Sequence, residues 1–239
     1  MIENVSATGS TNADLAARLG AGEHLAEGYW LVADRQTAGR GRQGRIWFDG
    51  YGNFMGSTVV RVGSGDPPAV SLALLCGVAV HAVISPLIPP PALAVLKWPN
   101  DVMIGRAKAA GILLERVRDC VIVGIGVNLA SAPQVDGRET TSLAASGPAP
   151  DRDLFAANLA RQFDIELERW RGSGLEPVVR RWLAAAHPVG TPLAVGEPGE
   201  LPLEGQFAGL TADGALQLRL ADGAVRTIHA GEVRLAGGQ

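Results

Sequence analysis

The chain of 239 residues contains little cysteine and few aromatic side chains, and neither sign of charge dominates it. Its two cysteines, Cys76 and Cys120, lie far apart and form no C-x-x-C pattern, which excludes a disulfide framework and a zinc knuckle. The net charge of -3 argues against a protein whose main task is to coat nucleic acid. Hydrophobic residues make up 47% of the chain, enough for a packed core. Unpaired cysteines suit a reducing compartment, so we expect a cytoplasmic protein.

The chain also shows no signal for export. Residues 1–10 hold no basic segment that leads into an apolar stretch, as a secretory signal requires. Residues 67–96 carry no formal charge, but their best helical part, residues 69–85, is shorter than the roughly 20 residues that span a bilayer. Prolines then end it at Pro86, Pro89, Pro90 and Pro91. We expect a helix buried against a sheet, and no membrane partner.

Up to about residue 187, the spacing of apolar residues predicts helices that alternate with strands. Strands are expected at residues 29–33, 53–62, 92–98, 109–117 and 120–129. Helices are expected at residues 13–19, 69–85, 155–170 and 175–186. The last two strands can form a hairpin that turns near Arg118 and Asp119. This pattern indicates an α/β domain.

The composition changes near residue 188. Two Asp-Gly turns, at residues 212–214 and 221–223, follow each other at a spacing of nine residues. Leucines alternate between them at Leu216, Leu218 and Leu220. This pattern predicts a β-meander. We therefore divide the chain into a domain of residues 1–187 and a small β-domain of residues 188–239.

An arginine- and glycine-rich segment follows the first predicted strand. Its residues 39–44 match the G-x-G-x-x-G pattern of dinucleotide-binding folds, but no helix follows them, so we reject that interpretation. No acid lies between Asp34 and Asp49, and the segment gathers Arg35, Arg40, Arg42 and Arg45. Arginine binds phosphate oxygens with two parallel hydrogen bonds, and glycine lets the backbone approach a ligand closely. The segment predicts an anion site; a solvated basic loop or an RNA contact is the alternative.

Two segments with lysine could bind or offset charge. Residues 97–101, KWPND, end a predicted strand in a turn, and a carboxylate such as Asp101 beside a phosphate site could hold Mg²⁺. Lys108 precedes an apolar strand and could offset negative charge that develops on phosphorus. The alternatives are a turn in which Asn100 and Asp101 cap backbone groups, and a lysine that only extends to solvent.

Small residues in predicted strands indicate a place where a ligand comes close. Gly124 and Gly126 alternate within one strand, which leaves two bare positions on one face, and Asn128 ends that strand with a donor and an acceptor. Gly111 interrupts the preceding strand. A bulge is the alternative explanation. Near the start of the chain, residues 10–12 offer three small hydrogen-bonding side chains, for which helix capping is the alternative.

Together these segments resemble the signature series of biotin protein ligases. The series comprises residues 36–47, 97–101, Lys108 with residues 110–113, and residues 124–128, in that order. Ser10-Thr11-Asn12 matches the opening motif of the family, and Thr141-Ser142-Leu143 matches a shorter one. The resemblance extends from about residue 5 to the end of the chain.

The resemblance implies a fold: an α/β (α+β) domain with a mixed sheet flanked by helices, similar to the core of class II aminoacyl-tRNA synthetases. A small C-terminal SH3-like β-barrel would follow it. Some members of the family also carry an N-terminal DNA-binding domain. Because the opening motif begins at Ser10, we expect the short, enzyme-only type and no DNA partner.

The resemblance also implies an activity with two steps. ATP and Mg²⁺ would activate biotin to biotinyl-5′-AMP, and a lysine of a biotin carboxyl carrier protein, such as that of acetyl-CoA carboxylase, would then receive it. The catalytic residues would be Lys108, Arg40 and Arg42. The biotin-binding residues would be Ser10, Thr11, Asn12, Gln36, Gly39, Gly41, Trp47, Lys108, Gly111, Gly124 and Gly126. ATP would contact Arg40, Arg42, Arg45, Trp47, Asn100, Lys108 and Asn128, and Asp101 would hold Mg²⁺.

Two other functions stay open at this point. A lipoate or octanoate protein ligase has a similar scaffold, but lipoate has no ureido group for Ser10, Thr11 and Gln36 to bind. A non-catalytic RNA-binding module would use the arginine segment, although aromatic residues make up only 5% of the chain. The sequence indicates a monomer or a weak homodimer and does not decide between them.

Overall fold

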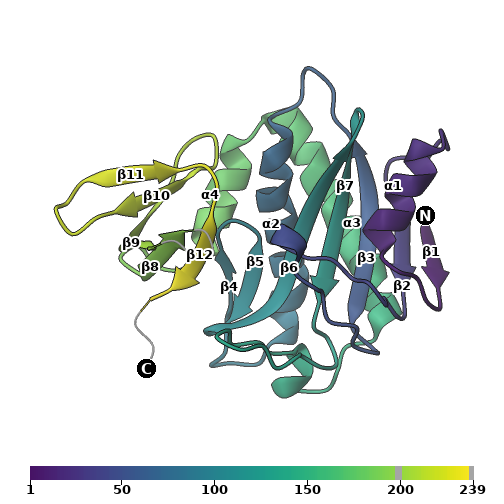
Figure 1. Cartoon of the computed structure of the whole chain (residues 1–239), viewed down its shortest axis with the longest axis horizontal. Coiled ribbons are helices and arrows are strands. Elements are labelled where there is room, and N and C mark those ends of the chain that lie inside the picture. The colour runs from purple at the N-terminus through teal and green to yellow at the C-terminus, as the bar shows by residue number, and fades with distance from the viewer. Residues whose placement is uncertain (197–200, 237–239) are drawn as a thin grey trace.

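The computed structural model describes residues 1–196 and 201–236, and it contains two sheets (Figure 1). The larger sheet has seven strands in the order β1-β2-β3-β7-β6-β5-β4. Its strands are β1 (Ile2–Val5), β2 (Trp30–Ala33), β3 (Phe54–Arg61), β4 (Ala94–Lys97), β5 (Asp101–Ile104), β6 (Ala107–Val117) and β7 (Cys120–Val127). β1 and β2 pair in parallel, and the other neighbours pair antiparallel. The predicted mixed sheet is confirmed.

Helices cover both faces of the larger sheet. They are α1 (Thr11–Gly20), α2 (Leu72–Ile84), α3 (Arg152–Ser173) and α4 (Glu176–Ala184). On one face, Leu15 and Leu19 of α1 join Leu31, Val59 and Ile122 in a small apolar cluster. On the opposite face, α2 and α3 pack side by side over the main core (Figure 1). The sheet therefore has one face fully covered by long helices and one covered only in part.

Local sequence signals set the ends of α3. Its first turn is capped by Asp151, whose carboxylate accepts a hydrogen bond from the Leu154 amide at 2.8 Å. Gly174 follows the last residue of the helix with a φ of 76°, a conformation that glycine adopts without strain. The apolar stripe that includes Phe155, Phe163 and Trp170 is buried against the sheet, as the spacing predicts.

The uncharged segment around α2 is part of the core. Residues 69–87 form a helical stretch with a mean hydropathy of 2.1. By length and composition alone, this stretch could cross a membrane. In the structure, 56% of an 18-residue stretch of this segment is buried inside the protein. Leu72, Leu75 and Val80 are each 0% exposed, and α2 packs against α3, α4 and several strands. The prediction of a helix buried against a sheet is confirmed.

The partly covered face of the sheet is bare where its central strands meet. Ser57 on β3 pairs with Gly124 on β7, which in turn pairs with Leu113 on β6. The adjacent row on the same face joins Gly126 to Gly111. Directly paired residues point to the same face, so these rows carry few large side chains. Next to α1, the sheet therefore has a low floor on which a loop or a ligand can lie.

The C-terminal part forms a separate antiparallel sheet in the order β11-β10-β9-β8-β12 (Figure 1). Its strands are β8 (Pro192–Gly196), β9 (Leu203–Leu210), β10 (Leu216–Arg219), β11 (Val225–Ile228) and β12 (Glu232–Leu235). The predicted meander corresponds to β9, β10 and β11. β12 returns to pair with β8, and the Val233 carbonyl of β12 accepts from Lys97 of the larger sheet. The domain boundary between residues 187 and 188 stays a prediction.

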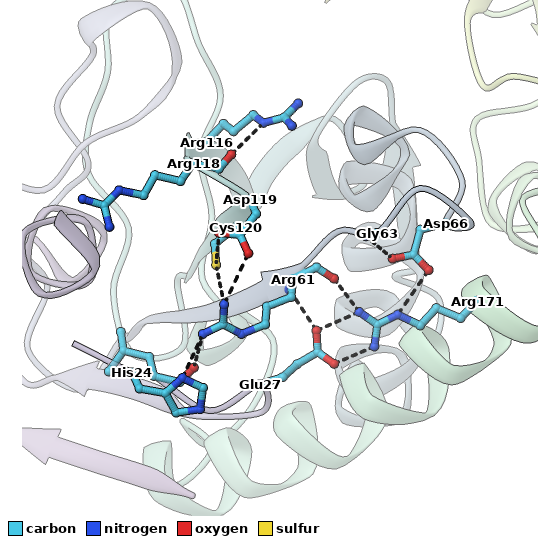
Figure 2. Close-up of polar contacts among 11 residues, drawn as sticks. His24, Glu27, Arg61, Gly63, Asp66, Arg116, Arg118, Asp119, Cys120 and Arg171 are labelled. Atoms are coloured by element: carbon cyan, nitrogen blue, oxygen red, sulfur yellow. Dashed lines mark hydrogen bonds and ion pairs between the residues drawn. The ribbon is translucent and has the colours of Figure 1, made fainter. Parts of the chain in front are cut away.

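An ionic network fastens α3 to Arg61, the last residue of β3 (Figure 2). Arg171 on α3 contacts the Glu27 carboxylate at 2.5 and 2.8 Å and donates to the carbonyl of Arg61 at 2.7 Å. The guanidinium of Arg61 lies 3.5 Å from Asp119, at the turn between β6 and β7. Two-pronged arginine–carboxylate contacts fix geometry as well as charge. The network therefore ties α3 to the end of β3 and, through Arg61, to the turn between β6 and β7.

The structure differs from the sequence prediction at two strands. β1 was not expected, because Ile2–Val5 is short and its Glu3 and Asn4 are polar and exposed. β5 begins at Asp101, where we expected only a turn. From the sequence alone, a polar residue at the start of a strand is assigned to a turn, because its cross-strand partners are not known. In this case the partner of Asp101 on β4 is Lys97.

Candidate active site

A cavity of about 1000 Å³ lies over the bare floor of the larger sheet. It is enclosed by the first turn of α1, the arginine-rich segment and the loop before residue 142, and β12 closes one side. Every predicted site residue except Gly39 lines it. Pockets of this size are typical of sites for small molecules and nucleotides. Segments that are far apart in the sequence, at residues 10–12 and 124–128, thus meet in one place.

The arginine-rich segment folds back on itself as a small hairpin, here called the arginine loop (residues 39–47). Gly39 accepts from the Trp47 amide at 2.9 Å, and Gly41 donates to the Arg45 carbonyl at 2.7 Å. Only a single 3₁₀ turn, Arg42–Gly44, lies between them. No α-helix follows the glycines, which agrees with our rejection of a dinucleotide-binding motif. Gly39 supports the base of this hairpin instead of lining the cavity.

The arginines of the loop have different environments. Arg42 donates to Asn100 Oδ1 at 3.0 Å, which ties the loop to the KWPND turn. Arg45 contacts Glu232 of β12 at 2.6 Å. Within the residues that the structure describes, Arg40 makes no side-chain hydrogen bond or ion pair, and it is exposed. Arg35 pairs instead with Asp49 at 2.7 Å and does not line the cavity.

Lys97, Asp101 and Lys108 form an ion cluster on the floor of the cavity. Lys108 Nζ lies 2.5 Å from Asp101 Oδ1, and Lys97 Nζ lies 2.9 Å from Asp101 Oδ2. Burial alone would raise the pKa of Asp101, but the charges of Lys108 and Lys97 outweigh it and hold that pKa well below its usual value. The carboxylate therefore stays ionised and fixes both ammonium groups.

This cluster does not fit the prediction that Asp101 binds Mg²⁺. Both carboxylate oxygens already accept from ammonium groups, and two neighbouring positive charges repel a divalent cation. Among the described residues, no group of three or more His, Cys, Asp or Glu side chains could hold a metal ion. We therefore correct the assignment: Asp101 is the counter-ion of two lysines.

Trp47 covers the row of the sheet that joins Gly126 to Gly111. A Cβ on Gly126 would lie 2.2 Å from Trp47 Cε2, and one on Gly111 would lie 3.1 Å from Trp47 Cζ3. Lys108 Nζ lies 5.7 Å from the centroid of the indole. The Trp47 Nε1 atom is buried and has no hydrogen-bond partner in the described part of the chain. Of the glycines we expected to form the floor of the pocket, Gly126 and Gly111 lie beneath this ring, whereas Gly124 lies beneath Asn12.

Polar side chains at the start of α1 form a second, uncharged end of the cavity. Ser10 occupies the N-cap position, but its side chain makes no capping bond. Thr11 donates through its amide to Gln36 Oε1 at 2.8 Å. Ser10, Thr11 and Gln36 are between 4% and 7% exposed. Helix capping therefore does not account for these side chains, and a ligand with polar groups fits them better.

Asn128 lies at the end of β7, at the nucleotide side that the motifs predict. Its Nδ2 donates to the carbonyl of Thr141 at 3.1 Å. Its Oδ1 is buried and has no partner among the described residues. A buried acceptor without a donor is costly, so a ligand donor at this position would stabilise it.

Several residues of the cavity were not found from sequence. Glu232 on β12 contacts Arg45 and also forms an ion pair with Arg138. Burial and repulsion from Arg138 lower the pKa of Arg45, and Glu232 opposes that shift. Lys97 additionally donates to the carbonyl of Val233 at 2.9 Å. These contacts join β12 to the cavity, and no local motif in the sequence marks them.

Comparison with known proteins decides the family. The Biotin/lipoate A/B protein ligase family matches residues 11–128, and the Biotin protein ligase C terminal domain matches residues 197–235. The chain is 37% identical over 238 residues to the biotin--[acetyl-CoA-carboxylase] ligase of Mycobacterium tuberculosis, covering 97% of this chain and 88% of that protein. It shares 36% identity with the ligase of the same name from Paracoccus denitrificans, covering 96% and 98%. The chain belongs to the biotin protein ligase family.

Solved structures of biotin protein ligases have the same fold. The enzyme from Aquifex aeolicus in complex with biotin and ATP aligns with a TM-score of 0.86 over 98% of this chain and 99% of that chain, at 24% identity. The biotin protein ligase of Leishmania major in complex with biotin aligns with a TM-score of 0.63 at 28% identity, over 96% and 98% of the two chains. The family expected from the motifs is confirmed, and the RNA-binding module is set aside.

Proposed function

We propose that this chain activates biotin with ATP and transfers it to a lysine of a biotin carboxyl carrier protein. The observation that carries the proposal is the arrangement of the cavity, which joins an uncharged polar end at Thr11 to a cationic end at Lys108. Biotin has the matching polarity, with a neutral ureido ring at one end and a carboxylate at the other. A lipoate ligase would have no use for the polar end, because lipoate lacks hydrogen-bonding groups there.

The first step joins two anions. The carboxylate oxygen of biotin forms a bond to the α-phosphorus of ATP, and the bond from that phosphorus to the oxygen bridging to the β-phosphate breaks, which releases pyrophosphate. Negative charge gathers on the oxygens around phosphorus. Lys108, Arg40 and Arg42 line this part of the cavity and offset that charge. Asp101 positions the Lys108 ammonium and thereby prepares it for this task.

We assign the nucleotide end to Asn128 and Asn100. Asn128 Oδ1 is an unpaired buried acceptor, and the exocyclic amine of adenine is a donor that would satisfy it. Asn100 holds Arg42, so it acts on the nucleotide through that arginine. Arg45 lies farther out, against Glu232, and would meet the distal phosphates. Mg²⁺ accompanies ATP in this chemistry and is assigned to no residue of this chain.

Biotin itself would lie between the polar end and the arginine loop. Ser10, Thr11 and Gln36 line the uncharged polar end of the cavity and would bind the ureido ring. Gly41 and Trp47 come from the loop above, and the indole excludes water from the reaction centre. Asn12 lies over Gly124, so both shape the floor beneath the ring.

In the second step the side-chain amine of the carrier lysine attacks the acyl carbon of biotinyl-5′-AMP, and AMP leaves. The carrier would be the biotin carboxyl carrier domain of acetyl-CoA carboxylase or of a related carboxylase. We further propose that the enzyme works in the cytoplasm as a monomer or weak homodimer, without DNA or membrane partners. Cys76 and Cys120 are both free thiols, which suits a reducing compartment.

Intact-mass analysis of a carrier domain tests the proposal. The domain is incubated with this protein, biotin and Mg-ATP; lipoate in place of biotin and a Lys108→Ala enzyme are the controls. We expect a mass gain of one biotin in the complete reaction and in neither control. A gain with lipoate alone would mean that the chemistry is right and the acid wrong. No gain with either acid would overturn the proposed activity.

A further inference from the structure

A series of hydrogen bonds runs from the half-buried Glu115 on β6 across the sheet to the buried polar end of the cavity. Glu115 on β6 accepts from Asn12 Nδ2 at 2.6 Å, and Asn12 Oδ1 accepts from Ser57 Oγ at 2.6 Å. Ser57 Oγ lies 2.6 Å from Thr11 Oγ1, and Gln36 Oε1 accepts from the Thr11 amide at 2.8 Å. Asn12, Ser57 and Thr11 are at most 4% exposed. Bulk water therefore does not compete for these groups.

The bare floor of the sheet makes this series possible. A Cβ on Gly124 would lie 2.3 Å from Asn12 Oδ1, so only glycine leaves room for the Asn12 amide. Gly124 pairs with Ser57 on one side and with Leu113 on the other. Glu115 follows Leu113 by two residues and therefore points to the same face of the sheet. The strand register brings its carboxylate to Asn12.

The first member of the series fixes the direction of the next two hydrogen bonds. A carboxylate only accepts hydrogen bonds, so Asn12 must turn its amide nitrogen toward Glu115. The Asn12 oxygen is then left facing Ser57. Ser57 has a single hydroxyl proton, and it must donate that proton to Asn12.

The direction is passed on to Thr11. Because the Ser57 proton is committed to Asn12, the contact between Ser57 and Thr11 needs the proton of Thr11. The other neighbour of the Thr11 hydroxyl is Gln36 Oε1 at 3.1 Å, which is also an acceptor. Whichever oxygen receives it, the Thr11 proton stays inside the protein. Thr11 lines the cavity and so offers a ligand only lone pairs.

We propose that Glu115 is a positioning residue that makes Thr11 an obligate hydrogen-bond acceptor for a ureido N–H of biotin. Glu115 is not among the described residues that line the cavity, and it acts through Asn12 and Ser57. The inference rests on the proposed function and deepens it, because it states which groups of the ring this subsite selects. An N–H matches the lone pairs of Thr11, whereas a ring oxygen in its place would meet them with lone pairs of its own.

A Glu115→Gln variant tests the inference. Glutamine has nearly the same shape but can present either an N–H or an oxygen to Asn12. The donor and acceptor of each hydrogen bond from Asn12 to Thr11 can then exchange roles. Binding is measured by calorimetry on the full chain, with biotin and with two analogues in which one or the other ureido N–H is replaced by a ring oxygen. For the wild type we expect the weaker analogue to bind about 10- to 100-fold less tightly than biotin. For E115Q we expect the affinity for biotin to fall about tenfold. The ratio of the affinities for biotin and for the weaker analogue should fall by about the same factor.

A second variant and a control make the test independent of one substitution. Ser57→Ala keeps Glu115 but interrupts the relay, so it should also reduce the preference for biotin over the analogue. Glu168→Gln, at an exposed position of α3, should leave both affinities unchanged. If both E115Q and S57A weaken biotin and analogue equally, or leave the preference intact, the inference is wrong. If the wild type itself fails to bind biotin, the proposed function is wrong, and the inference with it.

Discussion

Trp47 and Gly126 approach so closely that a Cβ on the glycine would lie 2.2 Å from the indole. Trp47 belongs to the arginine loop, and Gly126 to β7 near the middle of the larger sheet. The loop therefore docks on the sheet through bare backbone. This contact sets the distance between the arginine loop and the sheet.

We expect Gly126→Ala to lift Trp47 away from the sheet. Overpacking of this kind typically costs about 1–3 kcal/mol. Here we expect this cost to destabilise the docked position of the arginine loop. The KM values for biotin and ATP should both rise by about tenfold or more. Gly147→Ala is the matched control, because a Cβ there meets nothing within 4 Å. Steady-state kinetics of both variants measures these effects. Unchanged KM values for G126A would show that the contact between Trp47 and Gly126 is not needed for substrate binding.

Lys108→Ala should separate binding from chemistry. Without its ammonium group, the charge that develops around phosphorus loses the cation that we assign to it on the floor of the cavity. We expect formation of biotinyl-5′-AMP, measured as pyrophosphate release, to be abolished. The Kd for biotin, measured by calorimetry, should change by less than about tenfold, or about 1.4 kcal/mol. Near-normal turnover of this variant would remove Lys108 from the catalytic role.

Asp101→Asn should change how stability depends on pH. The pKa of Asp101 is depressed in the folded protein, so its ionised form stabilises the fold above the unfolded pKa of about 3.9. That stabilisation is lost as pH falls from this value toward the folded pKa. At pH 7 we expect D101N to be less stable than the wild type by about 3 kcal/mol, because Lys97 and Lys108 lose their counter-ion.

The difference between wild type and D101N should shrink as the pH falls below about 4. Urea denaturation at several pH values measures it. Asp222→Asn, at an exposed position of a turn, is the control and should change stability little. A gap between wild type and D101N that stays constant down to low pH would contradict the depressed pKa.

Glu232→Gln should alter the affinity for ATP. Glu232 holds Arg45 and Arg138. In the proposed complex with ATP, both arginines would leave Glu232, at least in part, to contact the triphosphate. Removing the negative charge removes this competition, so the KM for ATP should fall by about threefold at low salt. The effect should weaken as ionic strength rises. Glu204→Gln, at an exposed position of β9 in the same sheet, is the control. An increased KM would show that Glu232 mainly positions the arginines.

Local patterns in the sequence predicted most helices and strands, and the cavity-lining residues that lie in glycine-rich or lysine-containing motifs. They did not reveal Glu115 or Glu232, because each acts through partners that only the fold brings near. Glu232 lies 187 positions after Arg45 along the chain. Glu115 reaches Asn12 only through the register of β6 and β7. In a strand, an isolated glutamate reads as solvent-facing until its face is known.

The role of Asp101 also could not be predicted from the sequence, because it depends on partners that the fold brings near. Its neighbours in sequence suggested a carboxylate available for a metal ion. The fold pairs it directly with Lys97 across β4 and β5, and a bulge in the pairing of β5 with β6 lets Lys108 approach from the other side. A carboxylate that two ammonium groups occupy has a different role from a free one, and only tertiary structure tells the two apart.

The pairing of both lysines with Asp101 also affects what the enzyme does to itself. Lys97 and Lys108 are the only lysines among the 239 residues, and their side chains are 14% and 23% exposed. Free amines attack an acyl adenylate indiscriminately once it escapes a pocket, but an ammonium group held by a carboxylate has no lone pair with which to react. The outer surface of this chain carries no lysine at all. The enzyme therefore offers its own reactive product almost no target for self-labelling, and leaves it to the carrier.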